Sequence, residues 1–532
     1  MNSVKLSRRR FMVRTALAGA GMALGAANCG QRAASRPNFV LIMADDMGFS
    51  DIGCYGSDIE TPNLDRLAAG GLRFSTFYNA ARCCPTRASL LTGLYPHQAG
   101  MGGMVKSDPD VPRGPYQGYL NNRCVTIAEL LKKSGYRTYM SGKWHVGENR
   151  PNWPCDRGFD RYFGLISGGA NYFDLSKGKR EGIERKMARD DERFTPPDSG
   201  FYMTDAFSEN AVRFLEEHRE RSPFFLYLAY TAPHWPLHAL PEDIDKYRGR
   251  FSRGWQIMRQ RRYQRLVDME IVSEGWPLSP LDEEVTPWEK VGNKVEMELK
   301  MAVYAAQIDR MDRGIGRVLD QLERMGAADN TLVMFLSDNG GCHEGGPWGF
   351  DLRENGLPPG GVDSYMSYGR SWANASNTPF RMFKHWVHEG GISTPLIARW
   401  PGVVAEPGSV THQTGHIIDI MATCLDAAGA TYPETFQDRP VTPLEGHSLV
   451  PVLRGRDREA HPALFWEHMG NRAVRAGKWK LVARKGEPWE LYDLENDRTE
   501  LDNVAPRYPH RVHEMAARYQ TWAEKCGVRD SG

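Results

Sequence analysis

Residues 83–87 read Cys-Cys-Pro-Thr-Arg, and their types and spacing could support nucleophilic chemistry on an anion. Pro85 suits the first turn of a helix, so we expect Cys83 near exposed backbone N–H groups and the positive end of that helix. This position favours bound anions and activates a nucleophile. Arg87 follows on the same turn and can donate several hydrogen bonds to a charged substrate. Taken alone, Cys83 could equally be a structural residue or a simple thiol nucleophile.

Two pairs of oxygen-bearing side chains offer a second kind of chemistry. Asp45-Asp46 and Asp338-Asn339 each follow an apolar run. Such ligands suit hard cations such as Ca²⁺ and Mg²⁺, whereas zinc usually takes histidine or cysteine. A single Asp-Asp pair is commonly a turn or a helix cap, but several carboxylates meeting at one place would repel each other without a cation. The two pairs together therefore predict a metal site.

A lysine and two histidines complete these polar clusters. Lys143 and His145 lie in Gly-Lys-Trp-His-Val-Gly, and His234 lies in Ala-Pro-His-Trp-Pro. A histidine in a turn is commonly an ordinary loop residue. These segments follow apolar runs just as the acidic pairs do, and the shared position favours a functional role.

Four apolar runs must position these side chains: residues 38–44, 137–140, 224–230 and 331–337. Continuous apolar runs of this length are typical of strands buried on both faces of a parallel sheet. Helical patterns separate them, at residues 61–68, 125–134, 205–220 and 297–325. The alternation predicts an α/β fold in which a large, mostly parallel sheet is flanked by helices.

This fold class predicts where the polar clusters meet. Ligands of open α/β sheets bind at the carboxyl ends of the strands. The clusters all follow predicted strands, so we expect them at one edge of the sheet. The residues concerned are Asp45, Asp46, Lys143, His145, His234, Asp338 and Asn339.

The pattern changes after about residue 455. Short β-type segments cover residues 463–468, 471–475, 479–484 and 489–494, and an amphipathic helical pattern covers residues 508–526. We therefore predict a small C-terminal subdomain, residues 456–532, with an antiparallel sheet and a helix. Residues 37–455 form the predicted catalytic domain, and residues 1–36 an export segment.

Composition excludes some classes of function. The 532 residues are 41% hydrophobic and 25% charged, with a formal charge of +1, which is ordinary globular composition. Residues 1–28 contain five basic side chains and no acid, so the remainder is mildly acidic and nucleic-acid binding is not expected. The basic stretch 248–265 could be a solvated helix face or the rim of a site for acidic substrates. The nine cysteines match neither a zinc pattern nor a small disulfide framework.

The N-terminus resembles an export signal. Residues 7–12, Ser-Arg-Arg-Arg-Phe-Met, are similar to the twin-arginine motif, and the apolar stretch 15–27 behind them is shorter than the roughly 20 residues that span a bilayer. Cys29 lies in a lipoprotein-like cleavage box, so lipid attachment there and ordinary cleavage before Arg36 are both open. We predict a periplasmic or cell-surface protein whose only membrane contact is this possible anchor. Folding before export predicts reduced thiols, although a later disulfide at Cys124 or Cys155 stays open.

Residues 83–93 also resemble a known signature. Cys-x-Pro-Ser/Thr-Arg followed by Leu-Thr-Gly is similar to the motif of type I sulfatases, especially bacterial arylsulfatases of the alkaline-phosphatase-like fold. The resemblance implies that a formylglycine-generating enzyme oxidises Cys83 to formylglycine (3-oxoalanine). It also implies Ca²⁺, in preference to Mg²⁺, bound by Asp45, Asp46, Asp338, Asn339 and matured residue 83. Lys143, His145, His234 and Lys384, which lies five residues before Glu389-Gly-Gly, match active-site positions. Ser167 lies about one residue from an expected serine, and His343 and His468 are candidates only.

The resemblance implies a mechanism for hydrolysing sulfate monoesters of aryl or carbohydrate alcohols. The hydrated aldehyde attacks sulfur, and Lys143, Lys384 and Arg87 neutralise the sulfate oxygens. His234 protonates the leaving oxygen, and His145 takes a proton as sulfate is expelled. Two alternatives stay open: a phosphodiester or phosphonate monoester hydrolase, and a non-catalytic sulfated-glycan binder if Cys83 is not matured.

Aromatic residues are predicted to shape the substrate pocket. They are Trp235, Trp348 and Trp372, together with the segment 466–468. The long stretch 340–380, taken to lack secondary structure, is predicted to be a substrate lid.

Overall fold

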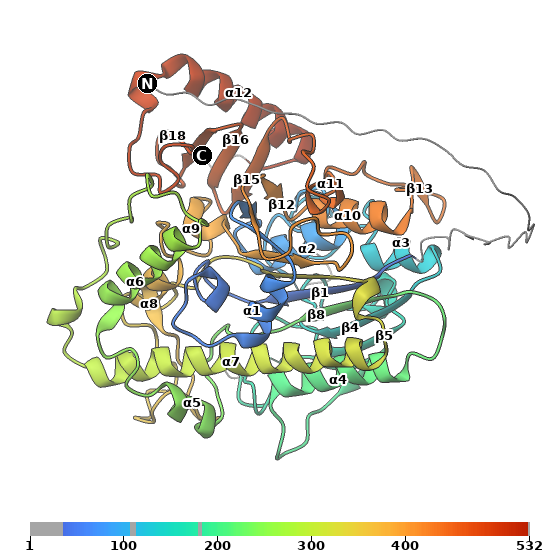
Figure 1. Cartoon of the computed structure of the whole chain (residues 1–532), viewed down its shortest axis with the longest axis horizontal. Coiled ribbons are helices and arrows are strands. Elements are labelled where there is room, and N and C mark those ends of the chain that lie inside the picture. Colours follow the sequence, from blue (N-terminus) through green and yellow to red (C-terminus); the bar gives the residue numbers. More distant parts are fainter. Residues whose placement is uncertain (1–35, 107–112, 179–183, 530–532) are drawn as a thin grey trace, which may run out of the picture. The chain divides into compact units, whose positions relative to one another are not determined.

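The computed structural model describes residues 36–106, 113–178 and 184–529 (Figure 1). The twin-arginine motif and Cys29 lie outside these residues, so the predicted export and lipid attachment stay predictions. Within the described ranges, each helix is too short or too polar to cross a membrane.

A ten-stranded sheet forms the centre of the fold, in the order β11-β2-β10-β9-β1-β8-β4-β5-β6-β7. Strands β9, β1, β8, β4 and β5 run parallel, while β10 and β6 pair antiparallel at either side of them. The mostly parallel sheet is confirmed. The strands are β1 (Asn38–Ala44), β2 (Leu72–Phe74), β4 (Arg137–Gly142), β5 (Arg161–Leu165), β6 (Met187–Arg189), β7 (Glu192–Phe194), β8 (Phe224–Ala229), β9 (Thr331–Ser337), β10 (Leu396–Arg399) and β11 (Val410–Thr411).

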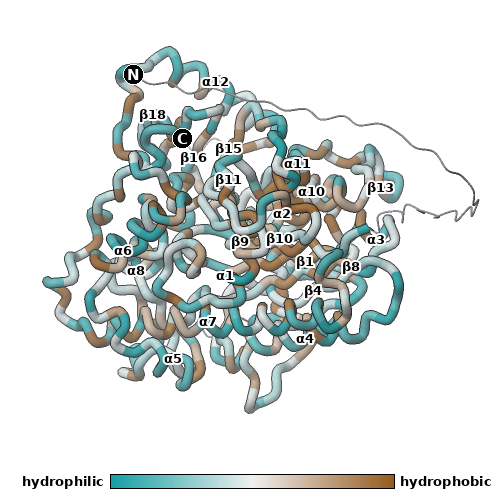
Figure 2. Tube along the Cα trace, viewed as in Figure 1, coloured by the Kyte–Doolittle hydropathy of each residue, from teal (hydrophilic) through white to brown (hydrophobic). Residues whose placement is uncertain are grey.

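The central strands are apolar along their whole length because both faces of the sheet are covered. In β1, Phe39, Leu41 and Met43 join one hydrophobic cluster, while the alternate residues Val40, Ile42 and Ala44 join the other. Figure 2 shows hydrophobic residues concentrated along these strands. The predicted strands buried on both faces are confirmed.

Helices cover the two faces as separate layers (Figure 1). One layer contains α1 (Pro62–Ala69), α4 (Met203–Glu217), α5 (Pro241–Tyr247), α6 (Gly254–Asp268), α7 (Lys294–Arg324) and α8 (Gly369–Ser376). The other contains α2 (Cys83–Thr92), α3 (Ile127–Lys133), α9 (Glu389–Ile392), α10 (Asp419–Ala428) and α11 (Val450–Leu453). Short strands pair nearby, β3 (Phe77–Tyr78) with β12 (Gly415–His416), and β13 (Thr435–Phe436) with β14 (Arg439–Pro440).

The four helices predicted between the strands are present as α1, α3, α4 and α7. Capping residues set two of their starts. Thr126 and Glu129 form a reciprocal capping box before α3. The Asn293 side chain accepts the backbone N–H of Glu296, so α7 begins three residues before the predicted start at Met297.

The C-terminal subdomain is the predicted antiparallel sheet with a closing helix. Its strands are β15 (Leu464–His468), β16 (Asn471–Ala476), β17 (Trp479–Ala483) and β18 (Glu490–Asp493), followed by α12 (Pro509–Cys526). Trp466 belongs to the same hydrophobic cluster as β1 and donates its indole N–H to the Asn79 carbonyl at 2.8 Å. The boundary near residue 455 stays a prediction.

Buried ion pairs also attach this subdomain to the catalytic domain. Lys480 Nζ lies 2.9 Å from Glu389 Oε1 and 2.8 Å from Glu500 Oε1, and Arg498 Nε lies 3.0 Å from Glu389 Oε2. These four side chains are almost completely buried. Burial opposes ionisation of Glu389, but Lys480 and then Arg498 outweigh it and lower the carboxyl pKa to about 2.

The predicted lack of secondary structure in residues 340–380 and the predicted pocket positions of Trp372 and Trp466 were wrong, while the lid role of residues 340–380 stays a prediction. The stretch 340–380 contains α8, and Trp372 is fully buried because it packs on Trp255 and Trp288 at centroid distances of 5.2 and 5.8 Å. Trp466 is buried as well. The basic stretch 248–265 is only partly a solvated face, because Arg262 is buried 2.6 Å from Asp51.

We expect Lys480→Met to lower the free energy of unfolding by about 3–5 kcal/mol, since it leaves Glu389 and Glu500 buried with one cation fewer. Chemical denaturation of the purified chain measures this. Lys525→Met is the control: Lys525 Nζ lies 2.7 Å from Glu445 on a side chain that is 63% exposed, so the change should stay below about 1 kcal/mol. Equal stability losses in the two variants would contradict the structural role of the buried pairs.

Candidate active site

The ends of four parallel strands lie level at one edge of the sheet. Ala44 at the end of β1 pairs with Ser337 at the end of β9, and Ala229 at the end of β8 lies beside Met43 and Gly142. The chain then continues directly into the predicted polar clusters. The sheet therefore brings together the residues predicted to converge: Asp45, Asp46, Lys143, His145, His234, Asp338 and Asn339.

The acidic pairs form a buried, oxygen-lined site. Asp46 Oδ1 accepts a hydrogen bond from Asn339 Nδ2 at 2.8 Å, and the Asp46 N–H donates to Asp338 Oδ1 at 3.1 Å. Asp45 Oδ1 and Asn339 Oδ1 are both buried without a hydrogen-bond partner. Buried acceptors of this kind are costly unless something satisfies them. A hard divalent cation would do so, and the all-oxygen set matches its preference.

Each carboxylate at this site has a buried cationic partner. Lys143 Nζ lies 2.5 Å from Asp45 Oδ2, Lys384 Nζ lies 2.6 Å from Asp46 Oδ2, and Arg87 Nη2 lies 2.8 Å from Asp338 Oδ2. All six groups are at most 1% exposed.

Burial and charge together set the pKa values of these groups. Burial opposes ionisation of Asp45, but Lys143, His234 and Arg87 lower its pKa overall. Burial and the charge of Asp45 raise the pKa of Asp338. Burial disfavours the charged form of Lys384, but Asp46 outweighs it and raises the lysine pKa.

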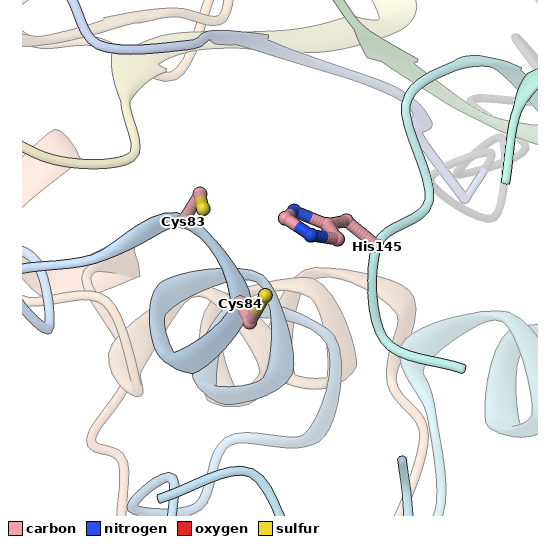
Figure 3. A group of neighbouring side chains, drawn as sticks. All are labelled: Cys83, Cys84 and His145. Carbon is pink, nitrogen blue, oxygen red and sulfur yellow. The ribbon is translucent and has the colours of Figure 1, made fainter. Parts of the chain in front are cut away.

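Cys83 is the first residue of α2, as its motif predicts. Arg82 before it is extended (φ −153°), and Cys83 is 2% exposed. Figure 3 shows its side chain beside Cys84 and His145. A hydrogen bond from Cys84, opposed by burial but aided by Lys143, lowers the pKa of the Cys83 thiol well below its usual range.

Two histidines, His145 and His234, lie close to Cys83 and the oxygen-lined site. The backbone of His145 is left-handed (φ 57°), as is that of Asp46 (φ 65°), a conformation that is uncommon outside glycine. Burial lowers the pKa of His145 to about 4 and also lowers that of His234. His234 Nδ1 donates to the Trp235 carbonyl at 2.5 Å, and its Nε2 lies 3.4 Å from Asp46 Oδ2.

Neighbouring glycines leave room for the two imidazoles. A Cβ at Gly168 would lie 2.8 Å from His145 Nε2, and one at Gly169 would lie 2.7 Å from His234 Cε1. Both glycines lie just after Ser167.

A cleft of about 580 Å³ opens onto Cys83, His145, His234 and Lys384. Trp235 lines it as predicted. Sequence reasoning missed Arg82 and Glu344, which also line the cleft and form an ion pair with Arg82 Nη2 3.1 Å from Glu344 Oε1. The Trp235 indole donates to Glu344 Oε2 at 2.7 Å. In the sequence, only the positions of these two residues indicated a role in the site: Arg82 directly precedes Cys83, and Glu344 lies just after Asp338-Asn-Gly-Gly.

Three further candidates lie apart from the cleft lining. The Ser167 hydroxyl is buried and accepts the backbone N–H of Lys186 at 3.1 Å. His343 packs against Phe383 and Trp386. His468 is fully buried, with its ring centroid 5.5 Å from that of His385.

Two family models match the chain. The model described as "Sulfatase" matches residues 37–430, and that described as "N-sulphoglucosamine sulphohydrolase, C-terminal" matches residues 380–523.

Individual relatives extend over nearly the whole chain. An uncharacterized sulfatase of Schizosaccharomyces pombe is 36% identical over 539 residues, covering 94% of this chain and 95% of its own. An arylsulfatase of Klebsiella aerogenes is 35% identical over 456 residues, covering 83% and 96%. The crystal structure of Ps i-CgsB in complex with k-i-k-neocarrahexaose is 27% identical with a TM-score of 0.69, covering 92% and 93%. The chain therefore belongs to the sulfatase family, and it is a sulfuric ester hydrolase.

Proposed function

We propose that the chain hydrolyses sulfate monoesters of aryl or carbohydrate alcohols, with Cys83 matured to formylglycine and Ca²⁺ at the oxygen-lined site. One observation carries the proposal. Residue 83 faces a cleft at the point where three buried cations, two histidines and unpartnered carboxylate and amide oxygens converge. Maturation requires a formylglycine-generating enzyme as a partner.

The two added groups would supply the reactive centre. Formylglycine supplies the oxygen nucleophile, and the cation, held by Asp45, Asp46, Asp338 and Asn339, supplies positive charge beside it. Calcium suits this set because it accepts many oxygen ligands in flexible geometry, whereas Mg²⁺ demands a near-octahedral arrangement.

The chain's own cations bind the sulfate. Lys143, Lys384 and Arg87 are fixed by carboxylates and backbone, so they need no reorganisation when charge develops on the sulfate oxygens. Removing a single preorganised donor of this kind typically costs about 3–4 kcal/mol in the transition state. Arg87 is fixed further by its Nη1, which donates to the Lys143 carbonyl at 3.0 Å.

The histidines divide the proton transfers. His234 lines the cleft beside Trp235, where a leaving oxygen would lie. Its Nε2 lies 3.4 Å from Asp46 Oδ2, and this negative charge opposes the effect of burial and favours the protonated ring, so we assign His234 as the proton donor. His145 faces residue 83, and burial keeps its pKa low at about 4, so it is neutral near pH 7 and can accept a proton there.

The cleft accepts an aromatic or sugar ring on the far side of the ester bond. Trp235 is held by its bond to Glu344 and can stack on either kind of ring. The arylsulfatase relative supports the first, and the Ps i-CgsB complex with neocarrahexaose supports the second.

We further propose that the chain is exported to the periplasm or cell surface, because residues 7–12 resemble the twin-arginine motif.

Replacing Cys83 with Ala is expected to abolish turnover of an aryl sulfate while circular dichroism stays unchanged. The same preparations of wild-type protein should show residue 83 about 18 Da lighter than cysteine by peptide mass measurement. Cys54→Ser is the matched control, since Cys54 is buried on the other face of the sheet. Full activity in Cys83→Ala would sink the proposal, and faster turnover of a phosphate diester by wild-type protein would favour the phosphodiesterase alternative.

Calcium is expected to stabilise the protein through the oxygen-lined site. At a hundredfold excess over its Kd, Ca²⁺ should add about 2.7 kcal/mol to the free energy of unfolding. Asn339→Ala removes one unpartnered oxygen and should lose most of this gain, measured by thermal unfolding with Ca²⁺ and with a chelator. Glu220→Gln, which alters an exposed pair with Arg137, should keep the full gain. An undiminished response in Asn339→Ala would place the ion elsewhere.

Gly168→Ala is expected to reduce kcat about tenfold or more, because the added Cβ displaces the His145 ring and misplacing a catalytic group is costly. Gly292→Ala is the control, since no neighbouring heavy atom lies within 4 Å of a Cβ there. Steady-state kinetics with an aryl sulfate tests both variants. Wild-type kcat in Gly168→Ala would contradict the assigned position of His145.

A further inference from the structure

Cys83, Cys84 and His145 form a second group of metal-binding atoms beside the oxygen-lined site. One ligand atom from each residue lies within 4.8 Å of the other two, and all three side chains are buried. Figure 3 shows the imidazole next to the two thiol groups. The cysteine spacing alone predicts no zinc pattern, because the third atom comes from the turn after β4.

The group has an unsatisfied member. His145 Nδ1 is buried and has no hydrogen-bond partner, on a side chain that is only 6% exposed. A buried ring nitrogen in this state is costly, and a metal ion would satisfy it.

The ligand set selects a soft cation. Two thiolates and one imidazole are the ligands that Zn²⁺ prefers, whereas Ca²⁺ takes oxygen. Three protein ligands leave a fourth zinc position free for water or another ligand. Cys83 and His145 line the 580 Å³ cleft, so the ion can enter from it and the fourth position can face it.

The surrounding charges permit a divalent ion. The nearby cations are already compensated, since Lys143 Nζ lies 2.5 Å from Asp45 and Arg87 Nη2 lies 2.8 Å from Asp338. Two thiolates balance the charge of Zn²⁺, and their protons leave to solvent as the Zn–S bonds form.

We propose that the chain binds one Zn²⁺ through Cys83, Cys84 and His145 as long as residue 83 is still a thiol. This zinc site goes beyond the proposed sulfatase function, because it belongs to the unmatured chain. Conversion of Cys83 to an aldehyde removes its sulfur ligand and abolishes the site. Zinc therefore marks the unmatured form and competes with maturation for the same sulfur atom.

The test uses the full-length chain purified with Cys83 as a thiol, from cells without the maturation enzyme. After treatment with Zn²⁺ in excess Ca²⁺ and removal of unbound metal, atomic emission should find about one zinc per chain. Cys84→Ser and His145→Ala should each weaken zinc binding at least tenfold, while Cys54→Ser should not. Matured chain, verified by mass measurement, should bind no zinc at this site.

Co²⁺ distinguishes the thiol site from the oxygen-lined site. Cobalt bound by Cys83 and Cys84 gives a thiolate charge-transfer absorption in the near-ultraviolet, which carboxylate ligands do not give. The proposal is overturned if unmatured chain lacks this absorption, if Cys84→Ser keeps it, or if matured chain has it undiminished. Sulfatase turnover is measured on matured chain alone, so either result leaves the test of the sulfatase function independent.

Discussion

The rest of the structure depends on ion pairs between three buried carboxylates and three buried cationic side chains. Asp45, Asp46 and Asp338 are removed from water at the ends of β1 and β9. An unpaired charge in such a place is strongly destabilising. Three cationic side chains therefore have to lie at this point. The end of β4 positions Lys143, the segment before α9 positions Lys384, and helix α2 positions Arg87.

This requirement explains the role of the C-terminal subdomain. Lys384 lies on a segment without a long helix or strand, five residues before Glu389. Glu389 is held by Lys480 and Arg498 through buried ion pairs. The segment that carries Lys384 is thereby fixed between the catalytic sheet and the C-terminal sheet. The subdomain contributes to the active site through this support rather than through Trp466 or His468, which do not line the cleft.

The sequence predicts those features that depend on periodicity and on strand ends. Parallel strands buried on both faces must be continuously apolar, so β1, β4, β8 and β9 are visible in the sequence, and their carboxyl ends locate Asp45, Lys143, His234 and Asp338. Features that depend on pairing between distant residues are hidden. Arg262 resembles its exposed neighbours, because its partner Asp51 lies more than 200 residues away. Arg82 and Glu344 are hidden for the same reason, and Trp372 looks like a loop residue because its aromatic partners lie on other elements.

The charge balance also explains why maturation suits sulfate. Counted as ionised, the three carboxylates balance the three cations, so the chain's own fixed charges sum to zero around residue 83. A thiolate at Cys83 cancels part of the positive charge that a divalent cation at the oxygen-lined site would supply, and it places a negative sulfur atom where the sulfate would bind. An aldehyde carries no charge, so a divalent cation at the oxygen-lined site leaves a net positive field that attracts a monoanion. The low pKa of the Cys83 thiol follows from the hydrogen bond with Cys84 and from Lys143. Lys143, which favours a bound sulfate, thus also favours the thiolate of Cys83, and conversion of residue 83 to an aldehyde removes the negative charge that would weaken sulfate binding.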